Sequence, residues 1–335
     1  MRQMPHAHSR GAGRQGHELG PLLLRLYRLA RESDVSAFKA GAFDIIRDHL
    51  PFESGLWGAM TVTAPDQTRV HWVHLDHQPM AMIENWQKYS AQDPSHRDTL
   101  EVLGRTVTIN IRREAARYPP ELVAHAHTYD ICHALSTTTH DPLLNLRNAV
   151  AFYRGWSGKP FSEAERRLTQ ELVPHLTEAW SLCAIRFVEQ APDSPSRGVR
   201  AVIDRAGSIH NAEPGFAELV RVEFPEWTGP VLPRGMTSKV VHTDGEMYRG
   251  RALVVVNARD LEDGMRLVSA RRLNAGAHLS PRELAVAQEF AAGRTYAEIA
   301  ERLRVAPKTV RNQLQSVYAK LGVTNKVGLL KRLDD

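Results

Sequence analysis

Side chains that can bond nucleic acid lie close together near the C-terminal end of the sequence. They are Thr295, Lys308, Thr309, Arg311, Asn312, Gln315 and Lys320. Arg and Lys neutralise phosphates or donate to guanine edges, whereas the amides of Asn and Gln match the edge of adenine. A threonine at a helix start can hold a phosphate through its hydroxyl and the neighbouring backbone amides. These residue types predict a DNA-contacting surface.

Three helices with tight connections would position this surface. The first is predicted to begin after Ser280, with Pro281 at its first position, and to end at Gly293. Thr295 caps the second helix, and the third begins at Pro307. Apolar residues line one side of the third helix at spacings of three and four residues: Val310, Leu314, Val317 and Leu321. A short helix, a tight turn and a longer helix with a polar outer side are the geometry of a major-groove reader.

The charge of this region supports the same prediction. Residues 276–333 contain ten Lys and Arg against four Asp and Glu, in a chain with a formal net charge of +5. The sequence pI is about 9.3. An excess of positive charge favours polyanionic partners such as double-stranded DNA. The alternative interpretation is a helical bundle whose surface charge is ordinary and has no nucleic-acid role.

The C-terminal motifs resemble the DNA-binding domain of the LuxR/NarL/FixJ regulators. The matching residues are Leu279–Glu283, Gly293–Thr295, Glu298–Ala300, Leu303, Lys308–Arg311, Leu314 and Lys320–Val323. The resemblance implies that Arg311, Asn312 and Gln315 read bases and that Thr309 contacts phosphate. It also implies a homodimer formed through the last helix, here about Asn325 to Leu333.

Two residues depart from the pattern of that family. Ala306 replaces the usual capping serine, and Gln313 replaces a common histidine. Loss of the cap is expected to cost about 1 kcal/mol. Pro307 offsets part of this cost because its ring presets the backbone angle of the first helical turn.

The upstream sequence predicts an α+β multidomain architecture. Helical and strand-like segments alternate from Leu19 to Glu189, and the last helix begins at a capping box, Ser162 to Glu165. The predicted strands are Ser54–Thr63, Thr68–Leu75, Thr106–Ile111 and Ala149–Arg154, followed later in the chain by Arg200–Asp204, Arg249–Ala258 and Met265–Arg271. The predicted helices of the first block include Met82–Tyr89 and Pro120–Tyr129.

Two weaker resemblances concern these upstream blocks. Pro160–Arg166 and Pro174–Leu176 are similar to GAF-like sensor domains that precede LuxR-type modules. Residues 200–222 resemble the opening strands and helix of a PAS domain. The expected divisions are a disordered basic tail (1–18), a GAF-like α/β sandwich (19–189), a linker (190–196), a PAS-like domain (197–272) and a four-helix LuxR-type helix-turn-helix domain (275–335).

A small-molecule effector site is expected in the first block. The candidate lining residues are Trp57, Trp72, Trp86, Tyr89, Asp93, Phe152 and Tyr153, because ligand pockets are mostly apolar with a few polar anchors. Trp86, Tyr89 and Asp93 are similar to the Trp, Tyr and Asp set of acyl-homoserine-lactone regulators, although their spacing is shorter. The alternative for these residues is a buried aromatic pair with Asp93 in a turn before a helix. The alternative for the protein is a regulator whose upstream blocks contact other proteins or dimerise without a ligand.

Other function classes lack support in the sequence. We find no receiver-domain pattern, no Gly-rich phosphate loop and no GxSxG elbow, so neither a catalytic residue nor a cofactor is predicted. His71 and His74 face opposite sides of a predicted strand, which argues against a shared metal. Cys132 and Cys183 show no metal or redox spacing, although Cys132 beside His133 leaves a reactive thiol open. Apolar runs too short to cross a membrane predict a cytoplasmic protein.

Overall fold

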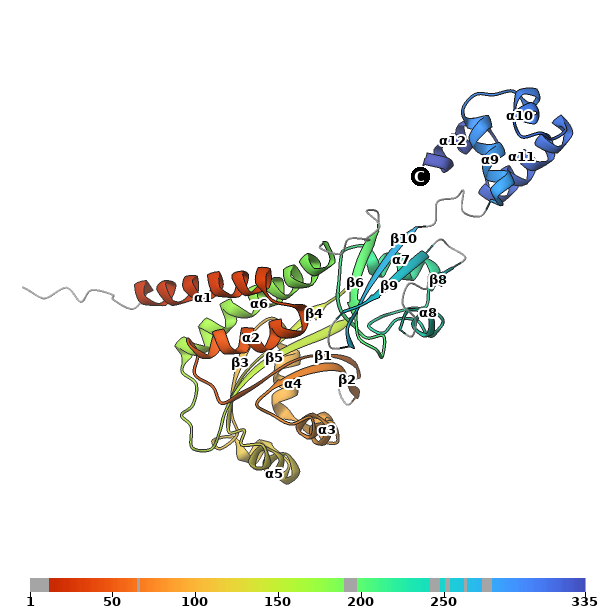
Figure 1. The fold of residues 1–335 in the computed structure, drawn as a ribbon. Helices are drawn as coiled ribbons and strands as arrows, with labels where there is room; N and C mark the ends of the chain where they lie inside the picture. Colours follow the sequence, from red (N-terminus) through yellow and green to blue (C-terminus); the bar gives the residue numbers. More distant parts are fainter. Residues whose placement is uncertain are drawn as a thin grey trace, which may run out of the picture.

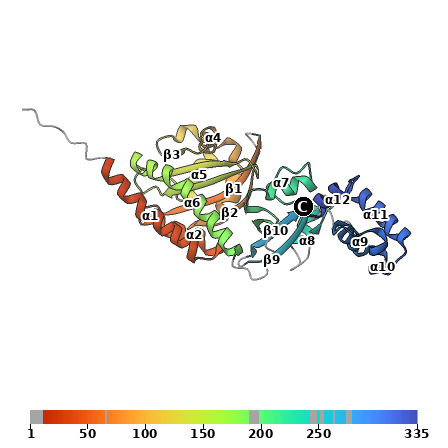
Figure 2. The same ribbon diagram turned by 90° about the horizontal axis from the view of Figure 1, so that it is seen from above.

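The computed structural model describes residues 12–64, 67–189, 198–241, 248–250, 254–261, 264–272 and 279–334. Within them the chain forms two five-stranded antiparallel sheets and a C-terminal bundle of helices (Figures 1 and 2). The strand orders of the two sheets are β2-β1-β5-β4-β3 and β7-β6-β10-β9-β8. When the strands of each sheet are numbered from one in chain order, both sheets have the strand order 2-1-5-4-3.

The first sheet is built from strands of 5 to 11 residues, and its register is interrupted in β1 between Ala59 and Met60 and between Val62 and Ala64. Its strands are β1 (Ser54–Ala64), β2 (Gln67–Asp76), β3 (Thr106–Asn110), β4 (His133–Asp141) and β5 (Leu146–Arg154). In the central pair Trp57 lies opposite Val150, and Leu56 lies opposite Ala151. Because successive side chains of a strand point to opposite faces, β1, β2, β4 and β5 each contribute to two different apolar layers.

Helices cover both faces of the first sheet (Figure 1). One layer packs Phe38, Trp57, Phe152 and Trp180 into the main core, and its helices are α1 (Ala12–Glu32), α2 (Val35–Arg47) and α6 (Glu163–Glu189). The other layer contains α3 (Ala81–Gln87), η1 (Ser90–Gln92), α4 (Pro94–Glu101), η2 (Ala115–Arg117) and α5 (Pro120–Thr128). A separate apolar cluster fills this second layer.

The second sheet is smaller and carries two short helices. Its strands are β6 (Val199–Ile203), β7 (Ile209–Ala212), β8 (Tyr248–Arg249), β9 (Val254–Asp260) and β10 (Arg266–Arg272). Its helices are α7 (Phe216–Glu223) and α8 (Arg234–Val240). The buried core is continuous from the first sheet into the second, so the two sheets share an apolar junction.

Most predicted elements are present, with four differences. The first helix begins at Ala12, so the prediction of a disordered tail is wrong for residues 12–18; residues 1–11 lie outside the described range. The single strand predicted over Arg249–Ala258 is two strands, β8 and β9, which pair with each other. Two strands, β4 and β7, were not predicted. The helix α8 was also missed, and α4 was anticipated only in the alternative that places Asp93 in a turn before a helix, because both helices are short.

The C-terminal bundle has its own apolar core. It consists of α9 (Pro281–Ala291), α10 (Tyr296–Arg302), α11 (Pro307–Leu321) and α12 (Lys326–Asp334). Val286, Ile299, Val310 and Val317 are fully buried at its centre. The linker predicted at residues 190–196 lies outside the described residues.

Candidate DNA-binding and ligand-binding sites

The first two helices of the bundle start at complete capping boxes. The Ser280 hydroxyl accepts the backbone N–H of Glu283, whose carboxylate accepts the backbone N–H of Ser280. Thr295 and Glu298 form the same reciprocal pair at α10. These bonds satisfy backbone donors that a helix start leaves free, so they define where the first two helices begin.

The third helix presents its predicted polar side to solvent. Val310, Leu314, Val317 and Leu321 are buried at helical spacing, which turns the opposite side of the helix outward. Lys308, Arg311, Asn312 and Gln315 are exposed there, and Thr309 is half-buried. Neither Lys308 nor Arg311 forms an ion pair with any residue in the described ranges. Two cations and two amides are therefore available to a partner along one side of α11.

Lys320 has a different position from these residues. Its ammonium bonds the Glu283 carboxylate at 2.7 Å, and the Ser316 hydroxyl donates to the same carboxylate at 2.7 Å. The Lys320 and Ser316 bonds lower the pKa of Glu283 to about 2. Lys320 thus joins α11 to the start of α9 while its side chain stays 42% exposed. Sequence reasoning placed it on the outer surface, where it lies, but missed its partner, which lies 37 residues earlier.

Thr295 is also engaged within the protein. Its hydroxyl donates to the Glu298 carboxylate at 2.8 Å and accepts the Glu298 backbone N–H at 3.4 Å. The side chain is exposed, but its donor is already used in the capping box. Contact with a phosphate by this hydroxyl would compete with the cap.

Ala306 leaves the start of α11 without a side-chain cap. Its backbone angles, φ −73° and ψ 147°, are those of an N-cap residue, and no side-chain bond is made there. We expect Ala306→Ser to stabilise α11 by about 1 kcal/mol because a hydroxyl would accept the N–H of Lys308 or Thr309. Slower hydrogen exchange of the amides in α11 would measure this gain.

The control for this substitution is Ala319→Ser, in the exposed interior of the same helix. A serine there has no free N–H to accept, and it is expected to be neutral or to destabilise by less than about 0.5 kcal/mol. Equal effects of the two substitutions would show that the missing cap is not responsible.

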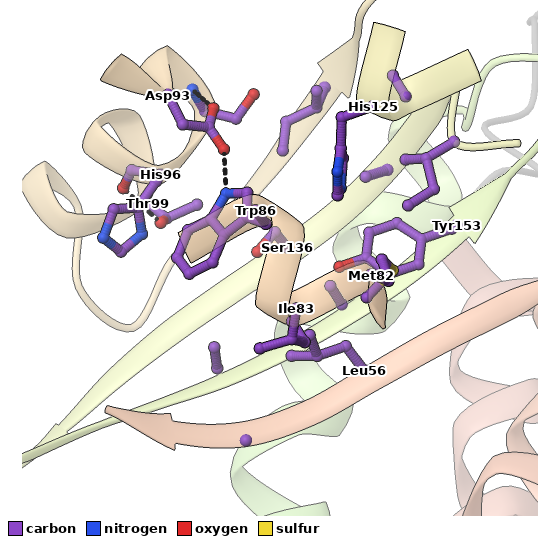
Figure 3. A pocket seen from close by; sticks show the side chains of 18 of the residues that line it. Leu56, Met82, Ile83, Trp86, Asp93, His96, Thr99, His125, Ser136 and Tyr153 are labelled. Atoms are coloured by element: carbon purple, nitrogen blue, oxygen red, sulfur yellow. Dashed lines mark hydrogen bonds between the residues drawn. The ribbon is translucent and has the colours of Figure 1, made fainter. Parts of the chain in front are cut away.

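A cavity of about 170 Å³ lies between the first sheet and the helices α3, α4 and α5 (Figure 3). Its walls are mostly aliphatic and aromatic, and no Lys or Arg of the described ranges lines it. The polar side chains at its wall are Asp93, Ser95, His96, Thr99, Tyr118, His125, Ser136, Thr138 and Tyr153, together with the Trp86 indole. An engineered apolar cavity of similar size binds benzene, so this space can hold at least a ring-sized ligand.

Three of the seven predicted ligand-site residues line this cavity: Trp86, Asp93 and Tyr153. Trp57 and Phe152 instead point to the opposite face of the sheet and pack against Phe38 and Phe43 of α2. This difference follows from the alternation of side chains along a strand. Leu56, Ala151 and Tyr153 face the cavity, so the residues next to them in sequence point to the opposite face of the sheet.

The other two predicted residues also lie away from the cavity wall. Trp72 points to the opposite face of the first sheet, where its ring stacks on His210 of the second sheet. Tyr89 packs in the apolar cluster beneath the helices but does not line the space.

Trp86 and Asp93 bind each other inside the cavity wall. The Trp86 indole N–H donates to Asp93 Oδ2 at 2.8 Å, as Figure 3 shows. The second oxygen, Asp93 Oδ1, accepts the Ser95 backbone N–H at 2.8 Å and caps α4. The indole has one donor, so this bond already uses it. This arrangement corresponds to the alternative in which Asp93 lies in a turn before a helix, beside a buried aromatic residue.

A second group of polar side chains at the wall has no hydrogen-bond partner among the described residues. It consists of the Tyr153 hydroxyl, the His125 imidazole and the Ser136 hydroxyl, all labelled in Figure 3. Burial raises the pKa of Tyr153 above its usual range and lowers the pKa of His125. Both side chains are therefore neutral at pH 7. Together they offer donors and acceptors to an uncharged molecule.

Sequence reasoning missed most of the polar cavity wall. Ser136 and Thr138 lie on the unpredicted strand β4, and Ser95, His96 and Thr99 lie on α4, for which no residue range was predicted. The run of three threonines at 137–139 is rich in β-branched residues and could have identified β4. Among the residues that the structure describes, no helix is both long and apolar enough to cross a membrane.

Residues 277–332 match the family model of bacterial regulatory proteins, luxR family. A comparison with curated proteins gave no match. Among solved structures, SdiA of Escherichia coli is similar over 95% of this chain and 96% of its own, at 13% identity and a TM-score of 0.39. SdiA in complex with octanoyl-rac-glycerol is similar over 98% and 96%, at 13% identity and a TM-score of 0.34.

The N-acylhomoserine lactone dependent LuxR family factor CepR2 of Burkholderia cenocepacia is similar over 52% of this chain and 98% of its own. The identity is 15% and the TM-score is 0.35. At these values the likenesses to solved structures carry no conclusion about activity. The family match, by contrast, coincides with the bundle and with the exposed side of α11. The C-terminal bundle is therefore a luxR-family helix-turn-helix domain of the kind found in bacterial regulatory proteins.

Proposed function

We propose that this protein is a DNA-binding transcriptional regulator and acts as a homodimer whose affinity for its operator is controlled by a neutral small molecule in the cavity of the first sheet. The observation that carries the proposal is the combination of an unpaired basic and amide-rich side of α11 with an apolar cavity elsewhere in the same chain. A ligand that binds one conformation of the protein better than another shifts the population toward it.

The proposed DNA contacts are those of the exposed side of α11. Arg311, Asn312 and Gln315 would contact base edges, and Lys308 and Thr309 would contact phosphates. Thr295 and Lys320 have lesser roles in this proposal, because their side chains already bond Glu298 and Glu283. The dimer contact is assigned to α12, where Val327 is 76% exposed and Leu330 is 36% exposed. The proposed role is regulatory and not catalytic. We assign the protein to the cytoplasm because its proposed partner is DNA.

The upstream part is proposed to comprise two sensor-type domains, divided near residues 190–196. Strands and helices up to Glu189 form the GAF-like domain, and the second sheet forms the PAS-like domain. The equal strand order of the two sheets supports this division. The effector cavity is assigned to the first of them.

The proposed effector is uncharged and largely apolar, with at least one oxygen or nitrogen for Tyr153, His125 or Ser136. A carboxylate or phosphate is disfavoured because the cavity wall has no cation and contains Asp93. Burial of an unpaired charge in such a space costs several kcal/mol. The Trp86–Asp93 bond is assigned to holding α3 and α4 over the cavity.

Thermal unfolding and DNA binding of the full chain test this proposal together. Octanoylglycerol is a neutral probe, and octanoate is the matched anion. We expect octanoylglycerol to raise the unfolding temperature and to change the anisotropy titration of labelled DNA from upstream of the coding region, whereas octanoate does neither. Tyr153→Phe is expected to weaken octanoylglycerol binding about 3- to 10-fold through loss of one hydrogen bond.

Saturable DNA binding with no effect of either probe would contradict the small-molecule proposal. It would favour the alternative in which the upstream sheets contact another protein or only dimerise. Absence of DNA binding on genomic fragments as well would contradict the regulator itself. The control variant is Tyr89→Phe, which removes a hydroxyl from the same apolar layer but not from the cavity wall.

A further inference from the structure

Lys39 is a buried lysine on the face of the first sheet opposite the cavity. It belongs to α2 and is only 7% exposed. Its ammonium nitrogen lies 4.2 Å from the centre of the Trp72 ring and 4.1 Å from the centre of the Trp180 ring. None of the described residues gives it a carboxylate partner, so two indole faces are its main polar contacts. A charged ammonium in this position is desolvated without an anion.

The titratable groups around Lys39 come from three other elements. On β2, burial and the Lys39 charge lower the pKa of His74. On α6, burial raises the pKa of the Cys183 thiol, and Arg186 lies near that thiol. On β7, burial lowers the pKa of His210 to about 4, although Asp204 bonds its Nε2. At pH 7 to 9 the two histidines are therefore uncharged, and at pH 7 the thiol is protonated.

The same residues form the junction between the two sheets. The Trp72 ring, which covers Lys39, stacks on His210 of β7 with centroids 4.6 Å apart and planes 16° from parallel. The next residue, Asn211, donates through Nδ2 to the Ser181 hydroxyl of α6 at 2.8 Å. The indole N–H groups of Trp72 and Trp180 are buried and have no hydrogen-bond partner in the part of the chain that the structure describes. Lys39 thus lies directly behind the surface on which β7 docks.

We propose that the docking of the second sheet on the first is controlled by the protonation of Lys39. The neutral amine fits the space between the two indole rings, and the docked arrangement keeps it there. The ammonium needs water, which it can reach only if the indole faces separate and the Trp72–His210 contact loosens. The attraction of a cation for two aromatic faces offsets only part of its lost hydration.

The direction in which docking depends on pH follows from the shift in the pKa of Lys39. Burial lowers its pKa from 10.5 to about 7 in the docked arrangement, and undocking restores a value nearer to the ordinary one. The undocked state therefore binds more protons between about pH 7 and pH 10.5, so docking strengthens as the pH rises through that window. The docking constant is expected to increase by up to about tenfold per pH unit.

The distance between two spin labels in the full chain measures docking. Lys159→Cys and Lys239→Cys place one label beside each sheet at exposed positions, while Cys132 and Cys183 are buried. We expect a narrow distance distribution at pH 9 and a broader one at pH 7. Lys39→Met, which is uncharged, should give the narrow distribution at both values. Lys39→Arg, which is always charged, should give the broad one at both.

Lys88→Met, at the exposed lysine that follows the last residue of α3, is the control and should retain the wild-type pH response. The proposal is overturned if the wild-type distribution is the same at pH 7 and pH 9, or if Lys39→Met keeps the wild-type change. If Lys39→Arg does not fold, Lys39→Met alone still decides. These outcomes are independent of whether the cavity binds an effector.

Discussion

Arg311→Ala is expected to weaken operator binding by about 10- to 100-fold. The side chain is exposed on α11 and makes no ion pair with the described residues, so its guanidinium is available for the two acceptors of a guanine edge. Such a bidentate contact contributes about 1–3 kcal/mol of discrimination. The measurement is fluorescence anisotropy of labelled operator and of an unrelated duplex, each titrated with the full chain at several salt concentrations.

The sequence dependence of the loss identifies the contact. A base contact predicts a larger loss on the operator than on the unrelated duplex, and Arg311→Lys should not restore it, because lysine lacks the planar pair of donors. An equal loss on both duplexes, with a salt slope reduced by about one, would mean that Arg311 contacts only phosphate. Arg28→Ala, at an exposed arginine of α1, is the control and should leave binding unchanged.

Glu283→Ala is expected to destabilise the DNA-binding bundle by about 1–3 kcal/mol. The Glu283 carboxylate accepts the Ser280 backbone N–H, the Ser316 hydroxyl and the Lys320 ammonium, and removing it leaves these donors without an acceptor. Because two of them belong to α11, that helix would also lose its polar link to α9, although the apolar contacts between the two helices remain. Hydrogen exchange of the α9 and α11 amides in the full chain would measure the loss.

The same carboxylate predicts a pH dependence of the bundle. The pKa of Glu283 is lowered to about 2 in the folded state, so its stabilising contribution is complete above the ordinary value near 4.5. The contribution decreases as the pH falls from about 4.5 toward 2. Glu283→Ala should abolish that part of the acid response. Glu301→Gln, at an exposed glutamate of α10, should retain it, and an unchanged acid response in Glu283→Ala would contradict this role.

The helices of the C-terminal domain could be predicted closely from the sequence because their signals are local. Ser280 and Thr295 each bond a backbone N–H three residues away, and Gly322 ends α11 with the left-handed backbone that glycine adopts at low cost. The absence of a side-chain cap at the start of α11 could also be predicted locally, because residue 306 is alanine. Caps, stops and a 3.6-residue apolar period involve neighbours within one or two turns, so one segment of chain contains the whole signal.

The two upstream sheets were predicted less completely. Strands such as β1 and β5 were recognised from their β-branched and aromatic content, but β4 was not, although it lies between β5 and β3. A strand pairs with partners that are distant in sequence, and its propensity depends on that setting. The number of strands and their order therefore required the tertiary structure.

Sequence alone determined the family of the DNA-binding domain, the side of α11 that faces outward and the presence of aromatic residues suited to an apolar site. Only the tertiary structure decided which of those residues share a cavity. It placed Tyr153 at the wall and Phe152, the preceding residue, on the opposite face. It also paired Trp86 with Asp93, Lys320 with Glu283, and Lys39 with two indole rings. The reason is physical: a side chain's environment is set by long-range packing, and residue type and spacing describe only what that side chain could do.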